Sequence, residues 1–157
     1  MSPPPSTPVG PPLQTRHDDD ALRRLLREVR RVAVLGASDQ PERAGCYVAT
    51  YLRDQGYEVV GVSPKLAGQP FCGRPAVARL GQVSAPIDLV DVFRRSEELA
   101  LHLPELLALQ PPPRAVWFQL GVRDDAVAAA LEAAGIDVVR DRCTLAEHRR
   151  LGVGPVP

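Results

Sequence analysis

Glycine and polar residues that could hold a phosphorylated ligand follow each of five apolar runs in this 157-residue sequence. The first run, Val32–Leu35, stops at Gly36-Ala37-Ser38, and Arg43 follows five residues later. Where a buried strand turns into a helix, backbone N–H groups and the positive end of the helix dipole point at one spot, and phosphate binds there. The Ser38 hydroxyl could donate to a phosphate and Arg43 could pair with one. The alternative is that Gly36 only makes the turn and Ser38 only caps the helix.

The end of the second run narrows the class of ligand. NAD sites usually place an acidic residue near the end of the second strand, where it binds the ribose hydroxyls. Here Glu58 lies early in the run and its end reads Ser63-Pro64-Lys65. Lysine at this place favours a ligand with a phosphate on its ribose, either NADP or coenzyme A, unless Lys65 is an exposed side chain without such a role. The first loop also has one glycine where the dinucleotide fingerprint G-x-G-x-x-G has three.

The third, fourth and fifth runs also end in residues that could contact a ligand. Arg94 and Arg95 follow Phe93, and adjacent guanidinium groups suit a phosphate contact or stacking on an adenine. The alternative for both arginines is pairing with Glu97 and Glu98 at the start of the next helix. The remaining two runs end at Gln119-Leu120-Gly121 and Asp141-Arg142-Cys143.

A catalytic set is not recognisable. The sequence has no G-x-S-x-G elbow, no phosphate-loop lysine motif and no H-E-x-x-H pattern. Cys143 could be a thiol whose pKa is lowered beside Arg142, or a small packing residue, and His148 is expected to form a surface or helix-capping pair with Glu147. We therefore predict no catalytic residue and no metal ligand, and whether the protein is an enzyme stays open.

The elements that must position these residues follow from the hydrophobic pattern. Strands are predicted over 32–35, 57–62, 87–93, 114–120 and 136–139, and helices over 21–29, 44–55, 96–109, 124–134 and from about 144. Pro104 is expected to kink or split its helix. This alternation predicts an α/β fold: a single, doubly wound, Rossmann-like parallel sheet of about five strands with helices on both faces. Ligands bind outside the carboxyl ends of such strands, so the five strand ends are expected to meet.

Composition bounds the class of protein. Residues 1–16 hold six of the 17 prolines and are predicted to be a disordered tail, before a domain over 17–152 and a short C-terminal tail at 153–157. Basic and acidic residues number 19 each, which argues against nucleic-acid binding. No apolar run approaches the roughly 20 residues that span a bilayer, and no secretory signal is recognisable. Three cysteines without a C-x-x-C motif indicate reduced thiols, and we expect a cytoplasmic protein that does not bind membranes.

The same segments resemble those of the small bacterial and archaeal coenzyme A-binding domain proteins. The resemblance runs from about Arg31 to Leu151, and six segments agree in order and spacing: Val34-Leu35-Gly36-Ala37-Ser38, Gly56-Tyr57-Glu58-Val59-Val60, Val62-Ser63-Pro64-Lys65, residues 87–95, residues 116–121, and Asp141-Arg142-Cys143 with Glu147-His148. The fold is also similar to the nucleotide-binding domain of the succinyl-coenzyme A synthetase α subunit. The catalytic histidine of that synthetase lies in a later domain, so ligase activity is not implied.

The resemblance implies non-covalent binding of coenzyme A or an acyl-coenzyme A by a stand-alone carrier, sensor or regulatory module. By it, the pyrophosphate is held by Gly36, Ala37 and Ser38; the ribose and its 3′-phosphate by Ser63, Pro64 and Lys65; the adenine by Phe93 and Arg94; and the pantetheine arm by Trp117, Phe118, Gln119 and Gly121. The family usually has asparagine where Ser63 stands. The alternatives are an NADP-dependent oxidoreductase-like protein and a thiol redox protein acting through Cys143. No protein partner is indicated.

Overall fold

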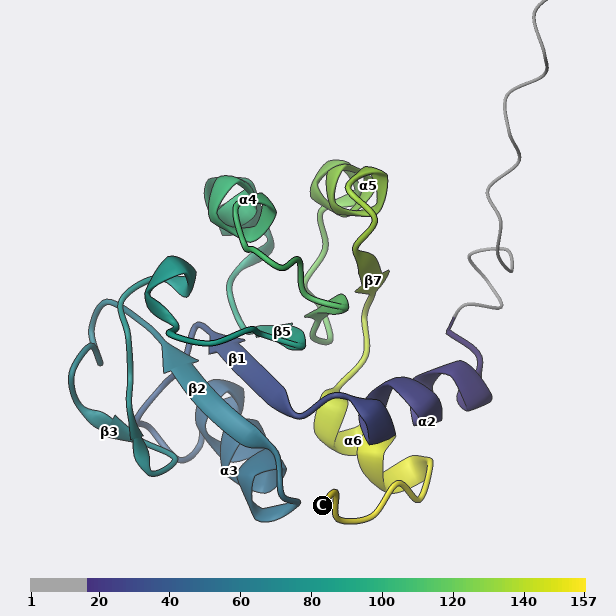
Figure 1. The fold of residues 1–157 in the computed structure, drawn as a ribbon, viewed down its shortest axis with the longest axis horizontal. Coiled ribbons are helices and arrows are strands. Elements are labelled where there is room, and N and C mark those ends of the chain that lie inside the picture. Colours follow the sequence, from purple (N-terminus) through teal and green to yellow (C-terminus); the bar gives the residue numbers. More distant parts are fainter. Residues whose placement is uncertain (1–16) are drawn as a thin grey trace, which may run out of the picture.

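Five parallel strands form the centre of the computed structural model, which describes residues 17–157 (Figure 1). The strand order is β2-β1-β5-β6-β7, and each neighbouring pair is parallel. The order therefore reverses between β1 and β5, which is the switch point of a doubly wound sheet. The predicted fold class is confirmed, whereas the predicted tail at 1–16 lies outside the described residues. The strands are β1 Arg31–Leu35, β2 Glu58–Val62, β5 Leu89–Val92, β6 Ala115–Phe118 and β7 Asp137–Val139.

Helices cover both faces of the sheet, as Figure 1 shows. On one face lie α2 (Asp19–Glu28), α3 (Ala44–Asp54) and α6 (Thr144–Arg150), and on the other lie α4 (Leu99–Leu107) and α5 (Asp125–Ala133). The strands β5 and β6 are buried at every position, as expected when helices cover both faces. Side chains alternate between two cores, so Trp117 packs on the first face and Phe118 on the second.

The predicted helix over 96–109 is divided, but at a different place from the one expected. A 3₁₀ turn, η2 (Ser96–Glu98), precedes α4, and α4 continues through Pro104, whose carbonyl accepts a hydrogen bond from Ala108 N–H at 3.0 Å. Leu99 and Leu106, on either side of the proline, are completely buried. Their burial offsets the one hydrogen bond that proline removes, so the predicted split at Pro104 does not occur.

Two short segments go beyond the predicted elements. Between β2 and β5 the chain forms a hairpin of β3 (Pro70–Phe71) and β4 (Arg74–Pro75), then a 3₁₀ turn η1 (Leu80–Gln82). Residues 153–157, expected to be a tail, lie against the domain: Val156 is buried, and its N–H donates to the Gln55 carbonyl at 2.8 Å.

Candidate ligand-binding site

The loops after β1, β2 and β5 meet at the carboxyl edge of the sheet. The N–H groups of Gly36 and Ala37 both donate to the Val62 carbonyl, at 3.0 and 3.3 Å, and Phe93 N–H donates to the Leu35 carbonyl at 2.8 Å. These bonds bring the first three predicted loops together. They also occupy the N–H groups of Gly36 and Ala37, so these residues shape the turn and do not present free donors.

Two glycines let α3 begin directly against the end of β1. Gly36 has a φ of +91°, and a Cβ atom on it would lie 2.7 Å from the Phe93 carbonyl oxygen. A Cβ atom on Gly45, in the first turn of α3, would lie 2.5 Å from the Gly36 carbonyl oxygen. Gly45 therefore supplies the close helix–strand approach that the third glycine of the fingerprint supplies elsewhere. Sequence analysis did not assign it this role, because its spacing from Gly36 is longer than the motif.

The N-terminus of α3 lacks the acidic cap that α2 and α5 have. Asp18 caps α2 and Asp124 caps α5, each accepting a backbone N–H bond through its carboxylate. The N-cap residue of α3 is Arg43, which makes no side-chain cap hydrogen bond, and the first turn of α3 contains no acidic residue. Arg43 is exposed, and its Nε donates to Gln40 Oε1 at 2.9 Å. Ser38 Oγ accepts from Gln40 N–H at 3.1 Å.

The residues predicted to bind the ligand after β2 and β5 differ in exposure and in their partners. Pro64 and Lys65 are exposed at the end of β2, while Ser63 is buried and its N–H donates to the Val77 carbonyl at 2.9 Å. Arg94 lies over Gly36 and pairs with Glu98 at 2.9 Å, which is one of the two alternatives that the sequence left open for it. Its Nε is buried without a hydrogen-bond partner among residues 17–157.

The residues predicted at the end of β6 divide into buried and exposed ones. Trp117 and Phe118 are completely buried, and the Trp117 indole N–H donates to the Arg142 carbonyl at 2.8 Å. Their rings belong to the two cores. Gly121 is exposed with a φ of +79°, and its N–H donates to Asp141 Oδ1 at 3.0 Å. This bond holds the ends of β6 and β7 together.

A buried polar cluster, which we call the Asp91 cluster, lies beneath the same edge and consists of Asp91, Gln119 and Thr144. Gln119 Nε2 donates to the Asp91 carboxylate and, at 3.0 Å, to Thr144 Oγ1, and Thr144 Oγ1 donates to Asp91 Oδ2 at 2.8 Å. Burial raises the pKa of Asp91 to about 7, although both hydrogen bonds act to lower it. Sequence analysis did not single out Asp91 or Thr144. The available signal was a carboxylate within the apolar run Leu89-Val90-Asp91-Val92.

His148 lies in the core between α3 and α6, so the expected surface pair with Glu147 is wrong. The imidazole is 2% exposed, and its Nδ1 shares a hydrogen bond with the Tyr51 hydroxyl at 2.7 Å. Burial lowers the pKa of His148. Glu147 instead pairs with Arg150 at 2.6 Å. Cys143, the N-cap residue of α6, is half-buried and packs against the same core.

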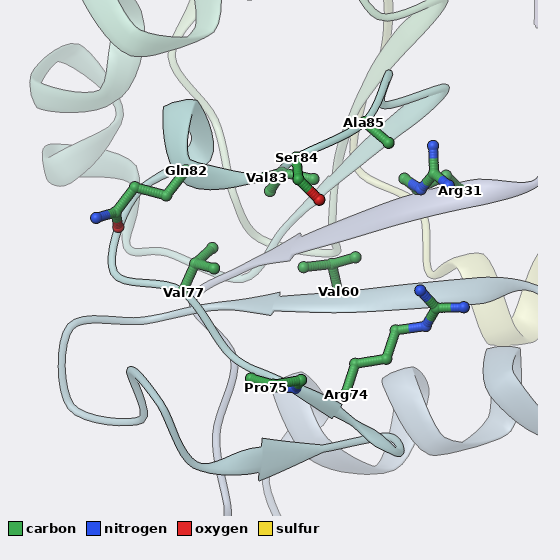
Figure 2. A pocket seen from close by; sticks show the side chains of 9 residues that line it. All are labelled: Arg31, Val60, Arg74, Pro75, Val77, Gln82, Val83, Ser84 and Ala85. Carbon is green, nitrogen blue, oxygen red and sulfur yellow. The ribbon is translucent and has the colours of Figure 1, made fainter.

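A separate hollow of about 190 Å³ lies along the edge strand β2 (Figure 2). Val60 forms its floor, and Arg31 and Arg74 lie together at one end of it. Glu58 pairs with both guanidinium groups. One carboxylate therefore pairs with two cations at this end of the hollow.

Comparison with known proteins assigns the chain to a protein family. The model of the coenzyme A (CoA) binding domain matches residues 30–149. The chain belongs to the CoA binding domain family. The Bacillus subtilis (strain 168) protein YneT is 34% identical over 127 residues, which cover 81% of this chain and 91% of YneT. Both measures agree with the resemblance that the sequence segments indicate.

Solved structures extend the CoA binding domain comparison to the fold. A Thermus thermophilus protein, cell-free ID.343, is 46% identical with a TM-score of 0.82, and the match covers 85% of this chain and 98% of that one. A Pyrococcus horikoshii OT3 protein is 26% identical with a TM-score of 0.78, covering 93% and 99%. The described helices include none that is long and apolar enough to cross a membrane, and residues 17–157 contain no group of three potential metal ligands.

Proposed function

We propose that this protein binds CoA or an acyl-CoA non-covalently at the carboxyl edge of its sheet. The observation that carries this proposal is the start of α3, which lies against the β1 turn without an acidic cap. A helix N-terminus leaves backbone N–H groups without helical partners and has a partial positive charge, so it suits the pyrophosphate of a nucleotide. Membership of the CoA binding domain family supports CoA as the nucleotide.

The ligand groups are proposed to follow the order of the strand ends. Ser38 and Arg43 are the donors for the pyrophosphate, with Gly36 and Ala37 shaping the turn beneath it. Ser63, Pro64 and the exposed Lys65 lie at the ribose and its 3′-phosphate, and Phe93 and Arg94 at the adenine. Gln119 and Gly121 border the pantetheine arm, to which the buried Trp117 and Phe118 contribute through their backbone. With no catalytic set recognised, the role that fits is that of a carrier, sensor or regulator in the cytoplasm.

Thermal unfolding with a panel of ligands tests the proposed function. A ligand present at 100 times its dissociation constant adds about 2.7 kcal/mol to the free energy of unfolding. We expect CoA and acetyl-CoA to stabilise the protein and NADPH to have no effect. Stabilisation by NADPH without any by CoA would instead establish the alternative of an NADP-binding protein.

Substitution of Lys65 tests the proposed 3′-phosphate contact. Lys65→Ala is expected to weaken CoA binding about tenfold, because one charge-assisted contact with phosphate is lost, and to weaken 3′-dephospho-CoA binding less than about twofold. Isothermal titration calorimetry measures both. Arg53→Ala, an exposed residue near the distal end of α3, is the control and should change neither. Equal losses for the two ligands would remove the contact.

The composition allows a second, direct measurement. Lys65 is the only lysine in the sequence, so reductive ¹³C-methylation labels one side chain besides the terminal amine. The NMR signal of methylated Lys65 should shift on addition of CoA and stay in place with the 3′-dephospho form.

A further inference from the structure

We infer that Asp91 is a positioning residue for the ligand site: through the Asp91 cluster it orients the side-chain amide of Gln119, and its ionisation makes CoA affinity depend on pH. This inference rests on the proposed function. Asp91 touches no predicted ligand group itself and acts through Gln119.

The geometry joins three segments that are distant in the sequence. Asp91 belongs to β5, Gln119 follows β6, and Thr144 is the first residue of α6. All three are buried, Asp91 and Thr144 completely. Water therefore does not compete for the hydrogen bonds between them, and each polar atom that faces the cluster must be satisfied within it.

The two ionisation states of Asp91 favour different orientations of the Gln119 amide. An ionised carboxylate only accepts, and the observed arrangement supplies donors from both Gln119 and Thr144. A protonated carboxyl must donate. If it donates to Thr144 Oγ1, the Thr144 hydroxyl loses its own acceptor in the cluster; if it donates to Gln119 Oε1, which reaches Asp91 after the amide rotates by half a turn, Thr144 keeps donating to Asp91. In the ionised state Oε1 is turned away from Asp91 and is free to accept from an amide N–H of the pantetheine arm. Protonation replaces that acceptor with a donor.

No charged side chain holds Asp91 in one state. Its neighbours across the sheet are Val34 and Trp117, and its pKa responds to burial, Gln119 and Thr144 alone. The helices on this face bring the following titratable groups: Cys46, Tyr47, Tyr51, Arg53 and Asp54 of α3; Cys143, Glu147 and His148 at α6, with Arg149 and Arg150; and the acids and arginines of α2. Tyr51 and His148 bond each other, and Glu147 pairs with arginines.

The pKa of about 7 places the ionisation of Asp91 within the physiological pH range. Because this pKa is raised and not lowered, a positioning role and a structural role predict different effects of Asp91→Asn. The pKa of Asp91 in the folded protein lies above the ordinary value of 3.8, so the stability it contributes is complete below about pH 4 and is lost as pH rises through 7. Asp91→Asn should therefore be more stable than the parent at pH 8. Its amide donates as the protonated acid does, so it should bind CoA as the parent does at low pH. If Asp91 had only a structural role, Asp91→Asn would not combine higher stability with weaker CoA binding at pH 8.

Calorimetric titration with CoA between pH 5.5 and 8.5 tests the inference. We expect equal affinities of the parent and Asp91→Asn at pH 5.5, and about fivefold tighter binding by the parent at pH 8, the effect of one hydrogen bond. The ratio of the two affinities at each pH cancels the titration of the phosphate of CoA itself. Asp54→Asn, at the far end of α3, is the matched control and should follow the parent. A ratio that does not vary with pH would overturn the inference.

NMR of the free protein separates this inference from the proposed function. The Gln119 side-chain amide signals should titrate with a midpoint near pH 7. They should not titrate in Asp91→Asn. Thr144→Val removes a donor and should move the midpoint upward, and Thr144→Ser should restore it. Gln119 signals that stay constant with pH would overturn the inference even if CoA binds. Titrating signals without CoA binding at any pH would overturn the proposed function.

Discussion

The cores on the two faces of the sheet differ in their content of buried polar groups. The core beneath α4 and α5 consists of aliphatic side chains and Phe118. The core beneath α2, α3 and α6 has the buried polar residues Asp91, Thr144 and His148 beside it, together with an indole N–H that needs the Arg142 carbonyl. The α4–α5 face can supply stability by burial alone. The face beneath α2, α3 and α6 has less of that stability, because it contains groups whose ionisation and hydrogen bonds respond to conditions.

The largest effect is expected on the apolar face. Leu106 of α4 is completely buried, and Leu106→Ala should lower the free energy of unfolding by about 3 kcal/mol, since it removes buried methyl groups and leaves a cavity. Urea denaturation at pH 6 and pH 8 measures this loss, which should be the same at both values. A loss that varied with pH would show that the α4–α5 face is coupled to titrating groups, and the two faces would then not differ in their response to pH.

A smaller effect is expected from the backbone contact on the other face. Gly45→Ala places a Cβ atom 2.5 Å from the Gly36 carbonyl oxygen, so the start of α3 must shift. We expect a loss of about 2 kcal/mol, as for other overpacked sites, and weaker CoA binding. Gly81→Ala is the matched control, because a Cβ atom there meets nothing within 4 Å. Unchanged CoA affinity in a destabilised Gly45→Ala variant would show that the N-terminus of α3 takes no part in CoA binding.

The smallest effect concerns His148 and sharpens the contrast through its pH dependence. The pKa of His148 is lowered by burial, so the stability it contributes is present above the ordinary histidine value of 6.5 and is lost as pH falls through the pKa of the folded protein. His148→Gln should cost about 1 kcal/mol at pH 7.5, because the bond to Tyr51 becomes a weaker one. Below pH 6.5 the variant should lose stability less steeply than the parent. Parallel stability curves from pH 5 to 7.5 would exclude His148 as the acid-sensitive group.

Much of the architecture was predictable from local patterns. The β-branched run ending at Gly36 indicates a buried strand and a turn, since both depend on residues adjacent in the chain. The order of strands and helices then specifies a doubly wound sheet, because βαβ units have one hand. The split expected at Pro104 does not occur, for the converse reason: a local rule against proline in helices omits the burial of Leu99 and Leu106 on the opposite side of the helix.

The sequence by itself established the fold class, the family resemblance and the edge of the sheet where the candidate site lies. These depend on hydrophobic period and turn chemistry, which short segments encode. Only the tertiary structure decided the state of the groups at that edge. Asp91 meets Thr144 across 53 positions and Gln119 across 28, and the raised pKa of Asp91 exists because the packed sheet and helices exclude water from all three. Desolvation is a property of the assembled core, so no segment of the sequence has it alone.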